Sequence, residues 1–178
     1  MRRQAMLLLM LFFCIFLASC STNSFKEGSE PDGFRNIKWG TNLRLLENMK
    51  HIGNRDDFGE VIALYIRMDD ELIVGGAALE KIEYSFWNNK FFEVSLGTGG
   101  YRKCAALKES AIERFGKGKN EKNKIIEWIG DKSIATFQGF ISGRCNLSIW
   151  SYDIYKELIN QSRQKSSNKA KEGAGKGL

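Results

Sequence analysis

Histidine is nearly absent from this sequence of 178 residues, which contains a single one, His51. Zinc sites use clusters of imidazole and thiolate ligands, and a nucleophilic cysteine needs a neighbouring base to form its thiolate. His51 lies in a polar segment that offers nothing to orient its ring. The sequence also lacks the spacing of a Walker phosphate loop and that of a calcium-binding loop. We therefore expect no catalytic constellation, no metal and no cofactor.

A second absence is that of an apolar run long enough to cross a membrane. The amino-terminal run covers residues 5–17, whereas a membrane-spanning helix needs about 20 apolar residues. It follows Arg2 and Arg3 and is followed by the small residues Ala18 and Ser19, which is the order of a secretory signal. We expect residues 1–19 to be a signal peptide that is removed on export.

The end of this signal, Leu17-Ala18-Ser19-Cys20, resembles a lipobox, the motif at which bacterial lipoproteins are acylated on the cysteine and cleaved just before it. The resemblance implies a mature chain that begins at Cys20 and carries acyl chains such as palmitate there. Two or three such chains hold a protein stably on a lipid bilayer. By the sorting rule of enteric lipoproteins, the non-aspartate residue Ser21 implies the outer membrane, facing the periplasm, rather than the inner membrane.

Basic residues outnumber acidic ones, and their excess is confined to one end of the mature chain. The formal net charge of +6 falls to +4 when Arg2 and Arg3 leave with the signal peptide, and residues 161–178 alone carry a net charge of +4. The body of the mature chain is therefore neutral. A polar, charged segment of this kind is expected to be disordered. A basic tail on an exported protein does not indicate nucleic acid as a partner, although it could contact lipid head groups or peptidoglycan.

The remaining sequence predicts one domain of the α+β class. Residues 20–33 are polar and rich in turn-forming residues, which is typical of a flexible tether, so we place the domain at residues 34–160 and a disordered basic tail at 161–178. Strands joined in hairpins form antiparallel sheets. We expect an antiparallel sheet of about six strands, with the helices packed on one face. The predicted strands cover residues 61–68, 81–87, 91–96, 125–129, 133–141 and 144–150, and the predicted helices begin near residues 42, 101 and 152.

The hairpin at residues 81–96 gives the most specific expectation about the fold. A three-residue loop at Asn88, Asn89 and Lys90 keeps one face of the hairpin apolar, and register follows the buried face. The other face then places Trp87 opposite Phe91. Two large rings exposed on a sheet face are typical of a partner-binding surface. A helix that covers the two rings is the alternative.

Two cysteines remain in the mature domain besides the expected lipidation site. Cys104 falls on the apolar face of the helix predicted at residues 101–115, and Cys145 alternates with apolar residues in the last predicted strand. Both side chains should therefore meet between helix and sheet. Because an exported protein matures in an oxidising compartment, the two residues form either a disulfide or a pair of buried free thiols. A catalytic thiol is the remaining alternative, and it lacks a base.

The segment FRNIKWG at residues 34–40 resembles an FRxIxWG motif of small exported proteins of Gram-negative bacteria, for which no activity is assigned. The resemblance implies export but no reaction. We therefore expect a membrane-anchored envelope lipoprotein that acts as a non-enzymatic binding or assembly module for an envelope protein or for peptidoglycan. The alternatives are a hydrolase or thiol enzyme with an unrecognised site, and a protein that binds acidic polymer through its basic tail.

Overall fold

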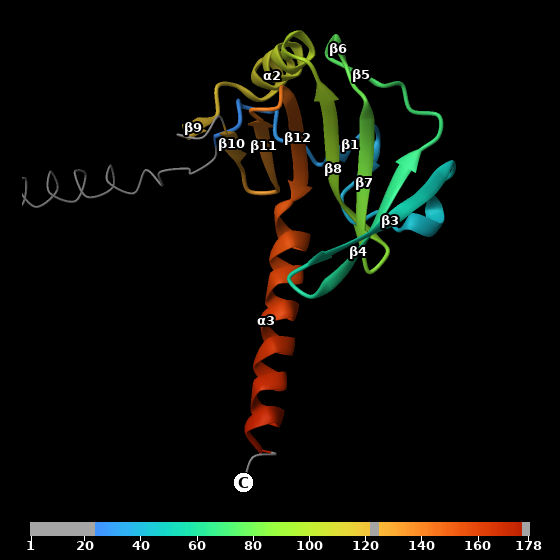
Figure 1. Ribbon diagram of the computed structural model, residues 1–178, viewed down its shortest axis with the longest axis vertical. Helices are drawn as coiled ribbons and strands as arrows, with labels where there is room; N and C mark the ends of the chain where they lie inside the picture. Colours follow the sequence, from blue (N-terminus) through green and yellow to red (C-terminus); the bar gives the residue numbers. More distant parts are fainter. Residues whose placement is uncertain (1–23, 122–124, 176–178) are drawn as a thin grey trace, which may run out of the picture.

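The structure is a computed structural model that describes residues 24–121 and 125–175 (Figure 1). The predicted signal peptide at residues 1–19 and the predicted lipidation site Cys20 therefore lie outside the described residues. Among the residues that are described, no helix is both long and apolar enough to span a bilayer. The strands are β1 (Gly33–Phe34), β2 (Ile37–Lys38), β3 (Met49–Asp57), β4 (Glu60–Arg67), β5 (Ile73–Val74), β6 (Ala77–Ala78), β7 (Lys81–Trp87), β8 (Lys90–Gly99), β9 (Lys119–Glu121), β10 (Ile125–Ile129), β11 (Ser133–Gly139) and β12 (Arg144–Ser151). The helices are the 3-10 turn η1 (Leu43–Leu45), α2 (Tyr101–Phe115) and α3 (Tyr152–Gly175).

The main sheet has eight antiparallel strands in the order β3-β4-β7-β8-β12-β11-β10-β9. Seven of them have at least five residues, and β9 has three. The order consists of two four-stranded meanders, which meet where β8 pairs with β12. Each meander is followed in the chain by a helix. The prediction of an α+β fold with an antiparallel sheet is confirmed, whereas the expected number of about six strands is too low.

The two strands that the sequence does not predict are the edges of this sheet. β3 has the sequence MKHIGNRDD, with a register shift between His51 and Gly53, and β9 has the sequence KNE. An edge strand pairs on one side only and is commonly polar or bulged, which discourages pairing with other chains. Both segments therefore lack the apolar alternation by which a strand is recognised. The helix predicted near residue 42 is also shorter than expected, a single 3-10 turn.

Helix α2 covers one face of the sheet, as its sequence pattern predicts. Its buried residues are Leu107, Ala111 and Phe115, which recur at a spacing of four, and Gly116 with a φ of 90° follows the last of them. A residue of positive φ is a common helix terminator, and glycine adopts this conformation without strain. The predicted boundaries of α2 are confirmed. The main core beneath α2 includes Ile82, Tyr84, Val94, Leu96, Leu147 and Ile149.

Helix α3 packs against the opposite face, so the prediction that the helices share one face is wrong. Ile149 and Trp150 are neighbours in β12, and successive strand residues point to opposite faces. Ile149 belongs to the main core, whereas Trp150 packs against a second apolar cluster. The apolar pattern of α3 shows which of its faces is buried, but not the side of the sheet to which the chain turns after β12. The second cluster consists of Ile62, Trp87, Phe92 and Leu158.

Helix α3 also extends beyond the predicted end of the domain. The sequence predicts a disordered tail from residue 161, whereas in the structure the helix continues to Gly175. The hairpin of β3 and β4 lies beside the first half of α3 (Figure 1). There Ser162 donates a hydrogen bond to the carbonyl of Phe58, and the rings of Phe58 and Tyr155 lie 6.4 Å apart. The order of this segment thus comes from tertiary contacts that its polar composition does not reveal.

An ion pair adds a further contact between the hairpin and α3. The ammonium of Lys165 lies 2.6 Å from one carboxylate oxygen of Glu60. Glu60 is only 6% exposed, and its other oxygen accepts a hydrogen bond from Nε1 of Trp87 at 3.3 Å. A buried carboxylate is tolerated when it is paired and hydrogen-bonded in this way. α3 is therefore held against the domain as far as Lys165.

The β7–β8 hairpin differs from its predicted register near the turn. The two pairs farthest from the turn are those expected, but the loop has only two residues, Asn88 and Asn89, and Phe86 pairs with Phe91 instead of Phe92. Both asparagines have positive φ, 50° and 61°, as a tight two-residue hairpin turn requires. A bulge in β8 takes up the extra residue. The bulge allows a short turn and an apolar face to coexist.

Candidate functional site

The segment at residues 24–33, for which the sequence predicts a flexible tether, packs against the domain. The backbone N–H of Ser24 donates to the carbonyl of Ile129 at 2.8 Å, and the N–H of Ile129 donates to Oγ of Ser24 at 2.8 Å. Phe25 is 8% exposed and meets the ring of Phe115 edge-on, with 5.4 Å between the ring centroids. The tether prediction is therefore corrected for this segment, because a buried ring and hydrogen bonds fix its position.

The residues that follow, Glu30 and Pro31, are hydrogen-bonded to the turn between β10 and β11. The carboxylate of Glu30 accepts hydrogen bonds from the backbone N–H groups of Lys132, at 2.5 Å, and Ser133, at 2.9 Å. Oγ of Ser133 in turn donates to the carbonyl of Pro31 at 2.6 Å and accepts from Nε1 of Trp39 at 2.8 Å. Trp39 belongs to the FRNIKWG segment, whose tryptophan therefore serves to hold the amino-terminal segment in place.

This packing limits the distance between the fold and the predicted lipidation site. Cys20 precedes Ser24 by four residues and lies outside the described residues. Four residues span at most about 14 Å even when fully extended. Acyl chains on Cys20 would therefore keep Ser24, and the edge of the domain to which it is bonded, close to the bilayer surface.

A cavity of about 370 Å³ lies against the segment at residues 30–35. Its floor is apolar, since the sheet contributes Leu96, Leu147 and Ile149 to it, and α2 contributes Ala111 and Phe115. Ligand pockets in proteins commonly have volumes of about 300–1,000 Å³ and mostly apolar linings with a few polar groups. The cavity therefore has the size and the lining expected of a site for a small apolar group.

Two arginines line this cavity, and they differ in their partners. Arg35 is held by Asp70, whose Oδ1 lies 2.7 Å from its guanidinium, and by two backbone carbonyls. Arg114, in the last turn of α2, is exposed and has no hydrogen-bond or ion-pair partner among residues 24–121 and 125–175. The carboxylates at the cavity are those of Glu30, which is bonded as described above, and of the exposed Asp32. Arg114 is thus the cation that remains available to a ligand.

Arg35 also belongs to a small hydrogen-bonded network that supports the fold. Asp70 also accepts a hydrogen bond from the hydroxyl of Tyr84 at 2.7 Å, and the Asp70 side chain is 5% exposed. Burial raises the pKa of Tyr84 far above its usual value of 10.0, and the hydrogen bond to Asp70 raises it further. The hydroxyl therefore remains a neutral donor at physiological pH. The network ties the amino-terminal segment to β7.

Trp87 and Phe91, the surface that the sequence predicts for a partner, are both buried. Their exposed fractions are 1% and 0%, and the two rings lie in different clusters on opposite faces of the sheet. The bulge in β8 turns Phe91 into the main core, while Leu158 of α3 packs with Trp87 in the second cluster. The prediction of an exposed ring pair is wrong, and a covering helix, the stated alternative, is found for Trp87.

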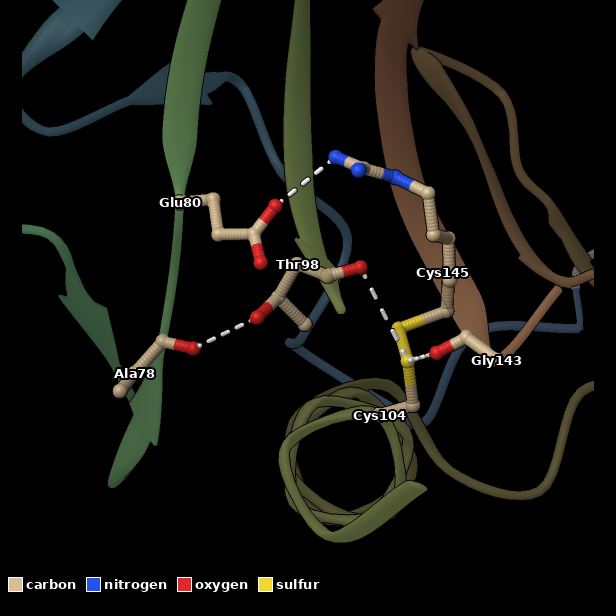
Figure 2. The surroundings of a disulfide bond; sticks show 7 residues. Ala78, Glu80, Thr98, Cys104, Gly143 and Cys145 are labelled. Carbon is tan, nitrogen blue, oxygen red and sulfur yellow. Dashed lines mark hydrogen bonds and ion pairs between the residues drawn. A yellow bond between two sulfur atoms is a disulfide. The ribbon is translucent and has the colours of Figure 1, made fainter. Parts of the chain in front are cut away.

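Cys104 of α2 and Cys145 of β12 are joined by a disulfide, with their Cα atoms 5.7 Å apart (Figure 2). Figure 2 shows this bond connecting the helix to the sheet beside Thr98, whose Oγ1 donates to the carbonyl of Ala78 at 2.9 Å. In the disulfide neither sulfur is available as a nucleophile. His51, the only histidine, lies on β3 at the far edge of the same sheet. The structure thus brings together the two cysteines but not the imidazole.

The acidic residues on the hairpin strands are engaged in ion pairs. Arg55 lies 2.6 Å from Glu93 and 2.7 Å from Asp57, and Lys81 lies 3.2 Å from Glu83. Burial alone would lower the pKa of Arg55, but the bonds to Asp57 and Glu93 outweigh burial and raise the pKa. Among the described residues, no group of three or more His, Cys, Asp or Glu side chains could hold a metal ion.

The cavity is therefore the candidate site, and it has no local signal in the sequence. Its lining comes from the amino-terminal segment, the β5–β6 hairpin, α2 and the middle of the sheet, which only the tertiary structure brings together. Comparison with protein-family models, with curated proteins and with solved structures finds no match for this chain.

Proposed function

We propose that this protein is a lipoprotein of the bacterial envelope, anchored through acylated Cys20 in the outer membrane and facing the periplasm. Two features support the proposal besides the lipobox-like residues 17–20. A disulfide between Cys104 and Cys145 suits an oxidising compartment. Ser24, the first described residue, is also hydrogen-bonded to Ile129 of β10, so that an anchor at Cys20 would hold the domain directly at the membrane surface.

In this position the domain acts as a non-enzymatic binding module for an amphipathic ligand with one apolar chain and an anionic head. The observation that carries this proposal is the cavity of about 370 Å³, which combines an apolar floor with Arg114, a cation without a partner in the described part of the chain. Each buried methylene group contributes about 0.8 kcal/mol, and a charge-assisted hydrogen bond from arginine fixes an anionic head group. A bilayer within reach of Cys20 would supply such amphiphiles, of which long-chain fatty acids are the simplest.

Titration with a long-chain fatty acid tests this function. The chain from residue 20 with Cys20→Ser retains every described residue and allows the titration without detergent. Arg114→Gln should weaken binding about tenfold, because it removes a charged hydrogen-bond donor, and Ala111→Leu should weaken it by filling the cavity. Lys108→Gln, an exposed position on the same helix that does not line the cavity, is the matched control. Absence of binding, or equal affinities of all three variants, overturns the binding proposal.

The anchor is tested separately on the protein as it occurs in membranes. Mass spectrometry of the mature protein should show an amino-terminal Cys20 that carries acyl chains. Substitution of Cys20 by serine should release the protein from the membrane fraction. An unmodified amino terminus at any other residue overturns the lipoprotein proposal and leaves the ligand titration unaffected.

A second candidate function is binding of peptidoglycan through the end of α3. The helix continues to Gly175, past the ion pair between Lys165 and Glu60, and this part carries Lys169 and Lys171. Truncation after residue 166 removes the free end and keeps the contacts of α3 with the hairpin. The truncated chain should sediment less with purified peptidoglycan than the full chain does. Unchanged sedimentation would argue against this function.

A further inference from the structure

Three large apolar side chains are exposed together at one corner of the domain. Tyr101, Phe140 and Ile141 have exposed fractions of 81%, 44% and 91%. Tyr101 begins α2, and the other two residues lie in the turn between β11 and β12. The turn and the helix are adjacent, since a Cβ atom on Gly143 would lie 3.8 Å from the ring of Tyr101. We call these three residues the apolar tip.

The backbone of the tip is fixed by hydrogen bonds. The N–H of Gly100, which precedes α2, donates to the carbonyl of Gly143 at 2.9 Å. Within the turn, the N–H of Gly143 donates to the carbonyl of Phe140 at 3.1 Å, and the N–H of Phe140 donates to the carbonyl of Arg144 at 2.8 Å. The disulfide crosslinks α2 to β12 directly beside Gly143 (Figure 2). The tip is therefore exposed on a backbone that hydrogen bonds and the disulfide hold in place.

The tip is bordered by positive charge. Arg102 and Lys103 follow Tyr101 in α2, and both are exposed, without a hydrogen-bond or ion-pair partner in the part of the chain that the structure describes. Arg144, on the other side, is paired with Glu80 at 2.8 Å. Within residues 24–121 and 125–175, two cations without a counter-charge thus accompany the apolar side chains. Aromatic side chains together with lysine and arginine are typical of surfaces that lie at the interface of a bilayer.

We infer that the apolar tip inserts into the interfacial region of the bilayer that anchors Cys20, with anionic phospholipid head groups against Arg102 and Lys103. The tip then forms a second, non-covalent membrane contact that sets the orientation of the domain. This inference rests on the lipid anchor proposed above. An anionic bilayer complements both the exposed rings and the unpaired charges, because its interface is apolar below and negatively charged above.

The anchor and the tip lie close enough to touch one bilayer. Ser24 is bonded to Ile129, which pairs with Ile134 near the start of β11, whereas the tip follows the end of β11. The seven residues of β11 span about 22 Å, and the chain from Cys20 to Ser24 reaches about 14 Å. A bilayer that touches the tip is therefore within reach of Cys20 when the strands are inclined to it by less than about 40°.

A tryptophan reporter at the tip tests the inference. The mature, lipidated protein with Ile141→Trp is reconstituted into vesicles of phosphatidylcholine and phosphatidylglycerol that carry brominated acyl chains, which quench tryptophan on contact. Leu45→Trp is the matched control, since Leu45 is 76% exposed in η1. Subtraction of the wild-type emission isolates each added indole. The quenched fraction should be at least about twice as large for Ile141→Trp as for Leu45→Trp, and it should fall in vesicles without phosphatidylglycerol.

Each outcome of this experiment bears on one proposal. Equal quenching of the two reporters overturns the membrane contact and indicates that the tip faces water or a protein. Quenching that does not depend on phosphatidylglycerol overturns the role of Arg102 and Lys103. Flotation of the vesicles reports on the anchor alone, because a chain without acylated Cys20 is lost from the lipid fraction whatever the tip does. Ile141 is almost fully exposed, so its substitution leaves the fold intact.

Discussion

Removal of the disulfide should lower the free energy of unfolding by about 4 kcal/mol at 25 °C. A crosslink stabilises chiefly by restricting the unfolded chain, and in the chain-entropy model the effect grows with the logarithm of the loop length. Cys104 and Cys145 are 41 residues apart, which gives about 4 kcal/mol. The loop runs from α2 through β9, β10 and β11 to the start of β12. It therefore includes most of one meander together with the helix that covers the main core.

Substitution of both cysteines by alanine is the cleanest perturbation. Cys145 is 3% exposed, so that alanine leaves only a small gap and no unpaired polar atom in the core. With an m-value of about 2 kcal/mol/M, the midpoint of urea unfolding should fall by about 2 M. The wild-type protein in a thiol reductant should show the same lower midpoint, whereas the double variant should not respond to the reductant.

Two results would refute this reasoning. A midpoint of the double variant within about 0.5 M of the oxidised wild type, which is about 1 kcal/mol, would show that the loop contributes little. Titration of two free thiols in denatured, non-reduced protein would show that the mature chain does not contain the bond at all.

Two further substitutions test packing that the sequence does not reveal. Phe25→Ala should lower the free energy of unfolding by about 3 kcal/mol, measured by urea unfolding, because the ring of Phe25 is buried against Phe115. An unchanged midpoint would mean that this segment is a flexible tether after all. The hydrogen bond from Lys165, opposed by burial and assisted by that from Trp87, lowers the pKa of Glu60 below its usual 4.5. The ionised Glu60 therefore stabilises the folded protein above about pH 4.5, the usual pKa. This stabilisation is lost as the pH falls through the lower pKa that Glu60 has in the folded state. Between about pH 5 and about pH 3, the melting temperature of Glu60→Gln should fall less than that of the wild type, and equal slopes would contradict the role of the pair.

The sequence predicts those parts of the fold in which apolar residues recur at the spacing of a helix or a strand. α2 has a buried residue at every fourth position, and its limits follow directly from that pattern and from Gly116. The β7–β8 hairpin is also predicted, but the position of its bulge is not. Both a three-residue loop and a two-residue loop with a bulge keep the same face apolar, so the pattern cannot distinguish them until Phe91 and Phe92 are placed.

The parts that the sequence misses depend on contacts with distant segments. Phe25 is a single apolar residue in a polar stretch and creates no period, yet it occupies a place in the main core. The basic end of α3 has the composition of a disordered tail, yet Ser162 and Lys165 contact the β3–β4 hairpin. The candidate cavity cannot be read from the sequence for similar reasons, because its lining comes from four segments and Arg114, which has no partner among the described residues, resembles any exposed residue of a helix.

The number of residues between Cys20 and Ser24 connects the proposed anchor, the order of the segment at residues 24–33 and the apolar tip. A flexible chain as long as the predicted tether would allow the domain to leave the bilayer, whereas a reach of about 14 Å from an acylated Cys20 to Ser24 would keep the domain, and the tip with it, near the lipid. Insertion of 24 Gly and Ser residues between Thr22 and Asn23 should keep the anchor and the fold. It would raise the root-mean-square reach to roughly 27 Å or more, which lowers the effective concentration of the tip at the membrane.

In this insertion variant, quenching of the Ile141→Trp reporter by brominated lipid should fall towards that of Leu45→Trp, while flotation and the urea midpoint stay unchanged. A semi-rigid insertion of about the same length, built from five Glu-Ala-Ala-Ala-Lys repeats, serves as the control for spacing without flexibility. Undiminished quenching in the flexible variant would mean that the tip contacts lipid without help from the short amino-terminal segment. The membrane contact would then be an independent property of Tyr101, Phe140 and Ile141, and the length of the amino-terminal segment would have no part in orienting the domain.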